Sequence, residues 1–134
     1  MKKPRKFEFT HFIKWSIVCK QEPPAKTLWI DVSSYADDPW NQFSPMIAHG
    51  EIPIPGLPGQ FSDCVEGIWQ GLKVIRGETA PRYFHGMGKK RGGKPSGHQF
   101  GKEKRLLKLE EARRRIYIPA YNSMLERVDQ ELIE

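Results

Sequence analysis

The sequence has little cysteine and no long hydrophobic run, and each absence excludes a class of protein. Only two of its 134 residues are cysteine, Cys19 and Cys64, which excludes a framework of several disulfide bonds and favours a reducing, cytoplasmic location. Residues 7–18 are rich in apolar side chains, but charged residues interrupt them and no small-residue cleavage site follows. We therefore expect neither a membrane span nor a signal peptide. Because His85 and His98 lack the spacing of metal ligands, we also expect no metal and no cofactor.

Acidic residues are the minority among the charged side chains. Sixteen Asp and Glu stand against 22 Lys and Arg, which gives a formal net charge of +6. A balance of this sign suits an anionic partner such as a nucleotide, a nucleic acid or a phosphate ester, although a basic surface without a specific partner fits equally well. The length fits one domain with a real core, and we find no internal repeat.

We predict a single compact α+β domain, with small strands in the N-terminal part followed by about four helices. Residues 1–6 are predicted to be a basic flexible tail and residues 7–134 to be the domain. Residues 7–18 alternate as in a strand, or as in a strand followed by a short helix, and residues 27–32 are predicted to be a strand. Residues 51–60 alternate apolar residues with prolines, which indicates an edge strand or a polyproline-like loop.

The second half of the chain carries the signals of helices. Ser62 and Asp63 are good N-caps, Gly77 is a suitable C-terminal stop, and Pro119 indicates a kink or a restart. The predicted helices run from residue 62 to about 76, from 79 to about 87, from 102 to 115 and from 120 to 132. A basic, glycine-rich loop, residues 86–101, separates the second helix from the third.

The first of these helices has polar residues next to its apolar face. Glu66, Gln70 and Lys73 lie at i, i+4 and i+7 and form a stripe, with Trp69 at its edge. A carboxylate beside an indole is suited to act as a general acid or base, and the alternative is an exposed Glu66 paired with Lys73 or Gln70. Gly67 and its neighbour one turn on leave a third side bare, where another backbone or a ligand can come close.

Three blocks of the sequence carry a family resemblance. Residues 65–73 read Val-Glu-Gly-Ile-Trp-Gln-Gly-Leu-Lys, residues 40–45 read Trp-Asn-Gln-Phe-Ser-Pro, and residues 80–90 run from Ala-Pro to Gly-Lys-Lys. In order and spacing they resemble the central helix, the Ser-Asn-Phe-Ser-Pro loop and the Ser-Pro…Lys segment of the NADAR (NAD- and ADP-ribose-associated) family. That family's closing Gly/Asn loop has no counterpart in this sequence.

The resemblance implies an NADAR-like fold and an N-glycosidase that removes ADP-ribose or ribose phosphate from a nucleobase adduct, as bacterial and phage relatives do. Its substrate would be an ADP-ribosylated nucleotide or nucleic acid. It implies that Glu66 is the catalytic acid and that Lys73 binds phosphate or attacks the ribose. The residues that would bind the substrate are Asn41, Phe43, Trp69, Gln70, Lys89, Lys90 and Arg91.

Two alternatives stay open. One is a non-catalytic binder of an NAD-derived nucleotide. The other is a basic accessory protein that binds nucleic acid through residues 2–6 and 89–115, although the acids interleaved in residues 102–115 favour an ordinary salt-bridged helix face. Neither alternative involves a membrane, and the sequence leaves the oligomeric state open.

Overall fold

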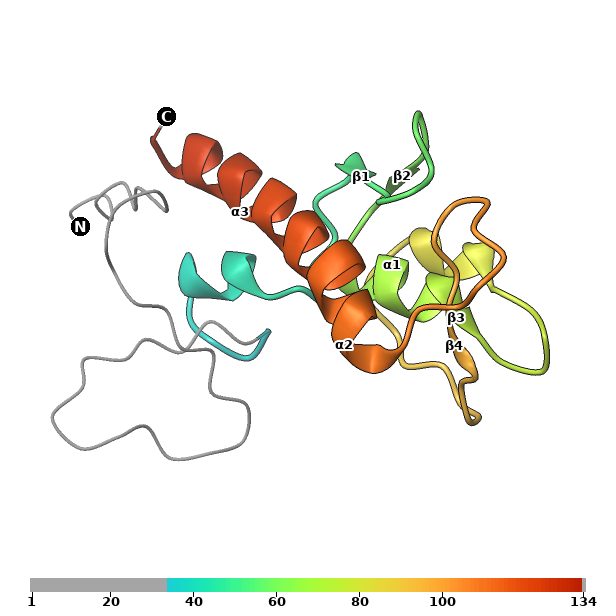
Figure 1. Cartoon of the computed structure of the whole chain (residues 1–134). Helices are drawn as coiled ribbons and strands as arrows, with labels where there is room; N and C mark the ends of the chain where they lie inside the picture. Colours follow the sequence, from blue (N-terminus) through green and yellow to red (C-terminus); the bar gives the residue numbers. More distant parts are fainter. Residues whose placement is uncertain (1–33, 134) are drawn as a thin grey trace, which may run out of the picture.

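The computed structural model describes residues 34–133, so the predicted tail and the predicted strands over 7–18 and 27–32 lie outside the described residues. The described part is a small α+β domain with two short antiparallel strand pairs and two helices. Helix α1 (Val65–Leu72) lies against the long C-terminal helix (Figure 1). Within this part, no helix is both long and apolar enough to cross a membrane.

Each strand pair is two residues long. β1 (Ile52–Pro53) pairs with β2 (Phe61–Ser62), and β3 (Lys73–Val74) pairs with β4 (Gly97–His98). The prediction of an edge strand within residues 51–60 is confirmed, because Pro53 lies in a two-stranded pair where its missing N–H costs little.

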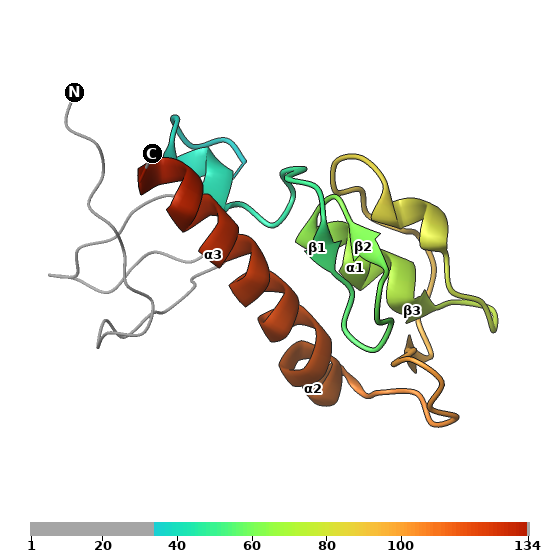
Figure 2. The same cartoon turned by 90° about the horizontal axis from the view of Figure 1, so that it is seen from above.

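Two 3₁₀ turns complete the domain. One is η1 (Trp40–Phe43), and the other is η2 (Pro81–Phe84), which covers α1 on the side away from the C-terminal helix (Figure 2). The predicted bare side of α1 is the reason for this arrangement. A Cβ on Gly67 would lie 2.4 Å from the Tyr83 carbonyl oxygen, and one on Gly71 would lie 2.4 Å from the Phe84 ring. The glycines therefore allow η2, rather than a ligand, to pack closely against α1.

The core lies between α1, β1 and the C-terminal helix. Val65, Ile68 and Leu72 are buried, as their helical spacing predicts. Full burial of one such aliphatic side chain contributes about 1.5–3 kcal/mol. The other large buried side chains of this core are Phe43, Ile52, Ile54, Phe84, Leu107, Ile116, Met124 and Val128.

The predicted ends of the first helix were wrong. Its N-cap is Cys64, whose Sγ accepts a hydrogen bond from the Gly67 N–H at 3.2 Å, and burial raises the pKa of this thiol. Asp63 instead accepts a hydrogen bond from the Gly86 N–H at 2.6 Å. The helix stops at Leu72, because the β-branched Val74 continues into a strand pair.

The prediction of about four helices was also wrong. Residues 79–87 contain only the single turn η2. The last two predicted helices are one: α2 (Leu109–Ala112), a π-helical turn η3 (Arg113–Tyr117) and α3 (Ile118–Ile133) follow without a break. The π turn widens the helix just before Pro119, where the missing N–H interrupts the α-helical bonding. Residues 102–108 stay outside the helix because Leu107 exchanges two main-chain hydrogen bonds with His98.

Candidate functional site

The first part of the basic loop lies along the polar stripe of α1. Gly88 donates its N–H to the Met46 carbonyl at 2.9 Å, and a Cβ built on it would come 2.8 Å from the Glu66 Cβ. Further along, the Arg91 N–H donates to Gln70 Oε1 at 3.2 Å. Glycine at position 88 lets the loop approach the helix this closely. The loop and the stripe, which lie apart in the sequence, therefore form one surface.

Gln70 connects the basic loop to the polar stripe of α1 by hydrogen bonds. Its side chain is only 4% exposed, and its Nε2 donates to Glu66 Oε1 at 2.6 Å while its Oε1 accepts the Arg91 N–H. The structure thus brings together three of the predicted site residues, Glu66, Gln70 and Arg91. Glu66 is half-buried with a fixed carboxylate orientation. The amide of Gln70 is occupied by its protein partners.

Arg91 closes the C-terminal end of α1. Its guanidinium donates to the carbonyl oxygens of Gln70 (3.3 Å), Lys73 and Glu78 (2.9 Å). The last carbonyls of a helix have no partner inside it, and a cation is favoured there by the helix dipole. One side chain therefore holds the basic loop, the end of α1 and the turn that follows β3 in a fixed arrangement.

That turn is a tight hairpin at residues 75–78. Ile75 and Glu78 exchange main-chain hydrogen bonds of 3.0 and 3.2 Å, and both central residues have positive φ, 54° at Arg76 and 79° at Gly77. Such turns prefer Asn, Asp or Gly at both positions. An arginine in the left-handed region of backbone conformations destabilises the fold by roughly 1–2 kcal/mol. The position of the Arg76 side chain at this turn therefore lowers local stability.

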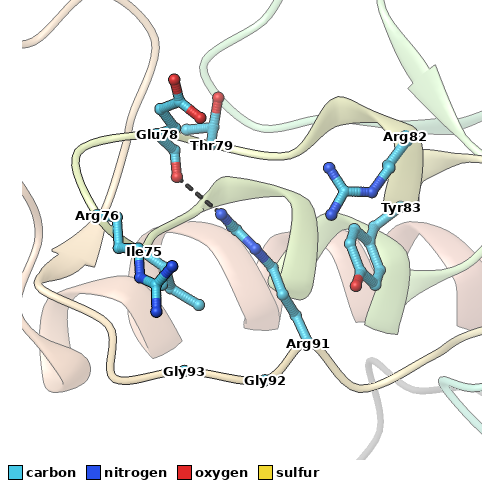
Figure 3. Close-up of a pocket in the computed structure, with 9 residues that line it drawn as sticks. All are labelled: Ile75, Arg76, Glu78, Thr79, Arg82, Tyr83, Arg91, Gly92 and Gly93. Atoms are coloured by element: carbon cyan, nitrogen blue, oxygen red, sulfur yellow. Dashed lines mark hydrogen bonds between the residues drawn. The ribbon is translucent and has the colours of Figure 1, made fainter.

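The hairpin, η2 and the basic loop enclose a hollow of about 500 Å³, here called the arginine hollow (Figure 3). Three arginines from three different segments line it: Arg76 from the hairpin, Arg82 from η2 and Arg91 from the loop. The Arg82 guanidinium lies 5.0 Å from the centre of the Tyr83 ring, a cation–π distance. The volume is within the range of small-ligand sites, and guanidinium groups are suited to an anion.

The net charge of the chain is concentrated around this hollow. Residues 73–94 contain seven of the 22 lysine and arginine residues and one of the 16 acids, Glu78. The rest of the chain, with 15 of each, is balanced. Segment 73–94 therefore accounts for the whole excess of positive charge, and the arginine hollow lies within it.

The remaining predicted site residues lie elsewhere. Phe43 is 5% exposed in the core, and its carbonyl accepts the Tyr121 hydroxyl at 2.7 Å. Asn41 lies in the same 3₁₀ turn, which packs against α3. Lys89 and Lys90 are exposed on the basic loop. Phe43 consequently presents no free ring face to a base, and Asn41 and Phe43 do not line the arginine hollow.

Trp69 packs against a buried histidine. Its ring centre lies 4.0 Å from that of His98 and 5.4 Å from that of Tyr117. Burial, followed by the charge of nearby Lys73, lowers the pKa of His98 to about 4, so this ring is neutral at pH 7. Lys73 is paired with His98 across β3 and β4. Within residues 34–133, no cluster of three or more His, Cys, Asp or Glu side chains is placed to hold a metal ion.

The sequence patterns do not point to Arg76, Arg82 or Tyr83. Gly77 fits the end of a helix, but it lies in the hairpin that presents Arg76. Two signals were available: an Arg-Gly pair between Ile75 and Glu78, and a run of 22 residues with a single acid. Arg91 hydrogen bonds join the basic loop to the hairpin, and packing against α1 places η2. Neither contact has a local signature in the sequence.

Comparison with curated proteins and with solved structures gave no match. These comparisons show no link to the NADAR family, so that resemblance stays a prediction. Over residues 14–134 the chain matches a family of unknown function, DUF6939. The chain therefore belongs to DUF6939.

Proposed function

We propose that the protein binds a nucleotide through its phosphate in the arginine hollow. The observation that carries this proposal is the convergence of Arg76, Arg82 and Arg91 on one concave site. Arginine binds phosphate oxygens with two parallel N–H donors, and such charge-assisted hydrogen bonds are about twice as strong as neutral ones. The surplus of positive charge in residues 73–94 attracts an anion to the same place.

The three arginines have different parts in this proposal. Arg91 is held by three carbonyl oxygens, so it contributes a fixed positive charge at the back of the hollow. Arg76 and Arg82 are exposed, and their guanidinium groups face the hollow from two sides (Figure 3). These two would therefore make the direct contacts with the phosphate.

The flat groups in the hollow favour a nucleotide over a simple phosphate ester. Tyr83 and the guanidinium of Arg82 lie in cation–π contact at one wall. Aromatic rings and guanidinium planes both stack on nucleobases. A volume of about 500 Å³ suits a ligand of nucleotide size.

Calorimetric titration with AMP, ADP-ribose and inorganic phosphate tests this function. Arg82→Gln should weaken binding of AMP and ADP-ribose by roughly tenfold to a hundredfold, the loss expected for a charged hydrogen bond. Arg114→Gln, an equal charge change on the exposed side of the C-terminal helix, is the control. Equal losses in both variants would show that net charge alone attracts the ligand, and the absence of binding to all three ligands would refute the proposal.

A second candidate is the N-glycosidase that the NADAR resemblance implies. It is favoured by the Glu66 carboxylate, which is half-buried, oriented by Gln70 at 2.6 Å and connected through Gln70 to Arg91. We propose in this case that Glu66 assists departure of the base. Lys73, the first residue of β3, would bind phosphate or attack the ribose, and Trp69 would support the helix that carries Glu66.

Mass spectrometry after incubation with ADP-ribosylated guanosine tests the glycosidase. Release of free ADP-ribose by the wild type but not by Glu66→Gln, which keeps an oxygen for the Gln70 hydrogen bond, would support it. Substrate that is retained intact by the protein would exclude the glycosidase and leave nucleotide binding in place.

A further inference from the structure

We infer that the nucleotide in the arginine hollow is one unit of a single-stranded nucleic acid, whose neighbouring phosphates contact Lys89, Lys90 and Lys94. This inference rests on the proposed function. It adds a second set of contacts, outside the hollow, and a class of partner.

The first argument is the position of the lysines. Lys90 directly precedes Arg91, and Lys94 directly follows Gly93, so exposed lysines flank both ends of the stretch that lines the hollow. Five residue steps separate Lys89 from Lys94, which an extended chain covers in at most about 18 Å. In a duplex, each strand has one phosphate per about 3.4 Å of helix axis. The lysines therefore match a track of a few nucleotides.

The second argument is the amount of charge. Residues 73–94 have six more basic than acidic residues, seven against one. A mononucleotide carries about two negative charges, since its phosphate resembles a phosphorylated side chain. Most of the positive charge around the hollow would therefore remain unmatched by a mononucleotide. A strand with several phosphates matches it and gains affinity from the counterions that are released.

The third argument concerns the shape of the site. The wall formed by Arg82 and Tyr83 is inside a concave hollow, and a base must enter it to stack. A base inside a duplex is stacked and paired, so its entry would require that it be flipped out at a cost of a few kcal/mol. An unpaired base avoids this cost. The hollow therefore favours a single strand over a duplex.

Fluorescence anisotropy of the full chain with a labelled oligothymidylate 12-mer tests the inference, with thymidine monophosphate and a 12-base-pair duplex as competitors. We expect the 12-mer to bind at least tenfold more tightly than the monophosphate at low salt. The double variant Lys89→Gln, Lys90→Gln should lower affinity for the 12-mer about tenfold. It should reduce the slope of log K against log salt by about 1.4, and weaken binding of the monophosphate no more than the control double variant does. The control is Lys102→Gln, Lys104→Gln, which changes two exposed lysines outside the hollow.

The outcomes separate this inference from the proposed function. Equal affinity for the 12-mer and the monophosphate would overturn the inference while nucleotide binding stands. Tighter binding of the duplex would overturn the single-strand part. An equal loss in the control double variant would mean that the lysines act only through net charge, which also overturns the inference. Failure of every probe to bind would overturn both proposals.

Discussion

Arg91 binds Glu78 through the main chain and not through the carboxylate: its Nη2 donates to the Glu78 carbonyl oxygen at 2.9 Å. Carbonyl oxygens fix the guanidinium without neutralising it. No ion pair within the described residues joins Arg91 to the Glu78 carboxylate. The charge of Arg91 therefore remains available to an anion, while its position is set by the fold.

Replacement of Arg91 by lysine should destabilise the domain although the charge is kept. The ammonium group cannot reproduce the planar fork that reaches the carbonyls of Gln70, Lys73 and Glu78. We expect the free energy of unfolding to fall by about 1–3 kcal/mol. Urea denaturation measures this, with Arg114→Lys as the matched control. Equal midpoints for the two variants would show that the hydrogen bonds of Arg91 contribute nothing.

Replacement of Arg76 by asparagine should stabilise the fold and weaken nucleotide binding. Asparagine tolerates the left-handed backbone that Arg76 adopts, φ 54°, so the free energy of unfolding should rise by about 0.5–1 kcal/mol. The same change removes a cation from the arginine hollow. Thermal denaturation and AMP titration together check both effects. Gly77→Ala, at φ 79° on the same turn, should instead lower stability. A destabilised Arg76→Asn variant would contradict the assignment of strain.

Gly71→Ala should destabilise the protein although alanine is the better helix former by about 1 kcal/mol. The new methyl group would lie 2.4 Å from the Phe84 ring, and overpacking of this kind typically costs about 1–3 kcal/mol. Gly92→Ala, where nothing lies within 4 Å of the new Cβ, serves as the control and should be nearly neutral. Chemical denaturation of both variants measures the two changes in the free energy of unfolding. Equal stability would mean that η2 moves freely away from α1.

Acid should destabilise the fold through His98. Its folded-state pKa of about 4 is below the usual value of 6.5, so the unfolded chain takes up this proton more readily. The neutral His98 ring therefore makes its full contribution to the free energy of unfolding above about pH 6.5. This contribution falls as the pH drops and is lost at about pH 4. The loss is about 3 kcal/mol at most. His98→Phe should remove this part of the pH dependence, whereas His85→Phe, at an exposed position, should not. Parallel curves for wild type and His98→Phe between pH 4 and 6.5 would contradict the burial of a neutral ring.

The features that could be predicted from sequence are local ones. The helical spacing of Val65, Ile68 and Leu72 identified the buried face of α1, because a period of 3.6 is visible within eight residues. Gly67 and Gly71 likewise indicated a face of close approach. In the same way, alternating prolines indicated an edge strand or a polyproline-like loop over residues 51–60, and the structure has a short strand there, Ile52–Pro53.

The features that were missed depend on contacts between distant residues. Pairing of Leu107 with His98 decides that residues 102–108 are not helical, and nothing within 102–108 shows this. The π turn before Pro119 likewise turns an expected break into a continuous helix. The arginine hollow requires three segments: the Arg91 hydrogen bonds join the basic loop to the hairpin, and packing against α1 places η2. Its residues could be recognised from sequence only as a run of basic charge.

The placement of that charge has a consequence for the approach of any ligand. In residues 34–72 and 95–133, eleven acids outnumber eight basic residues, whereas segment 73–94 carries the opposite sign. The potential around segment 73–94, which forms the arginine hollow, is therefore positive. Such a field attracts an approaching polyanion before contact, which raises the association rate at low ionic strength. Added salt would slow the encounter and leave the dissociation of the closest contacts comparatively unchanged.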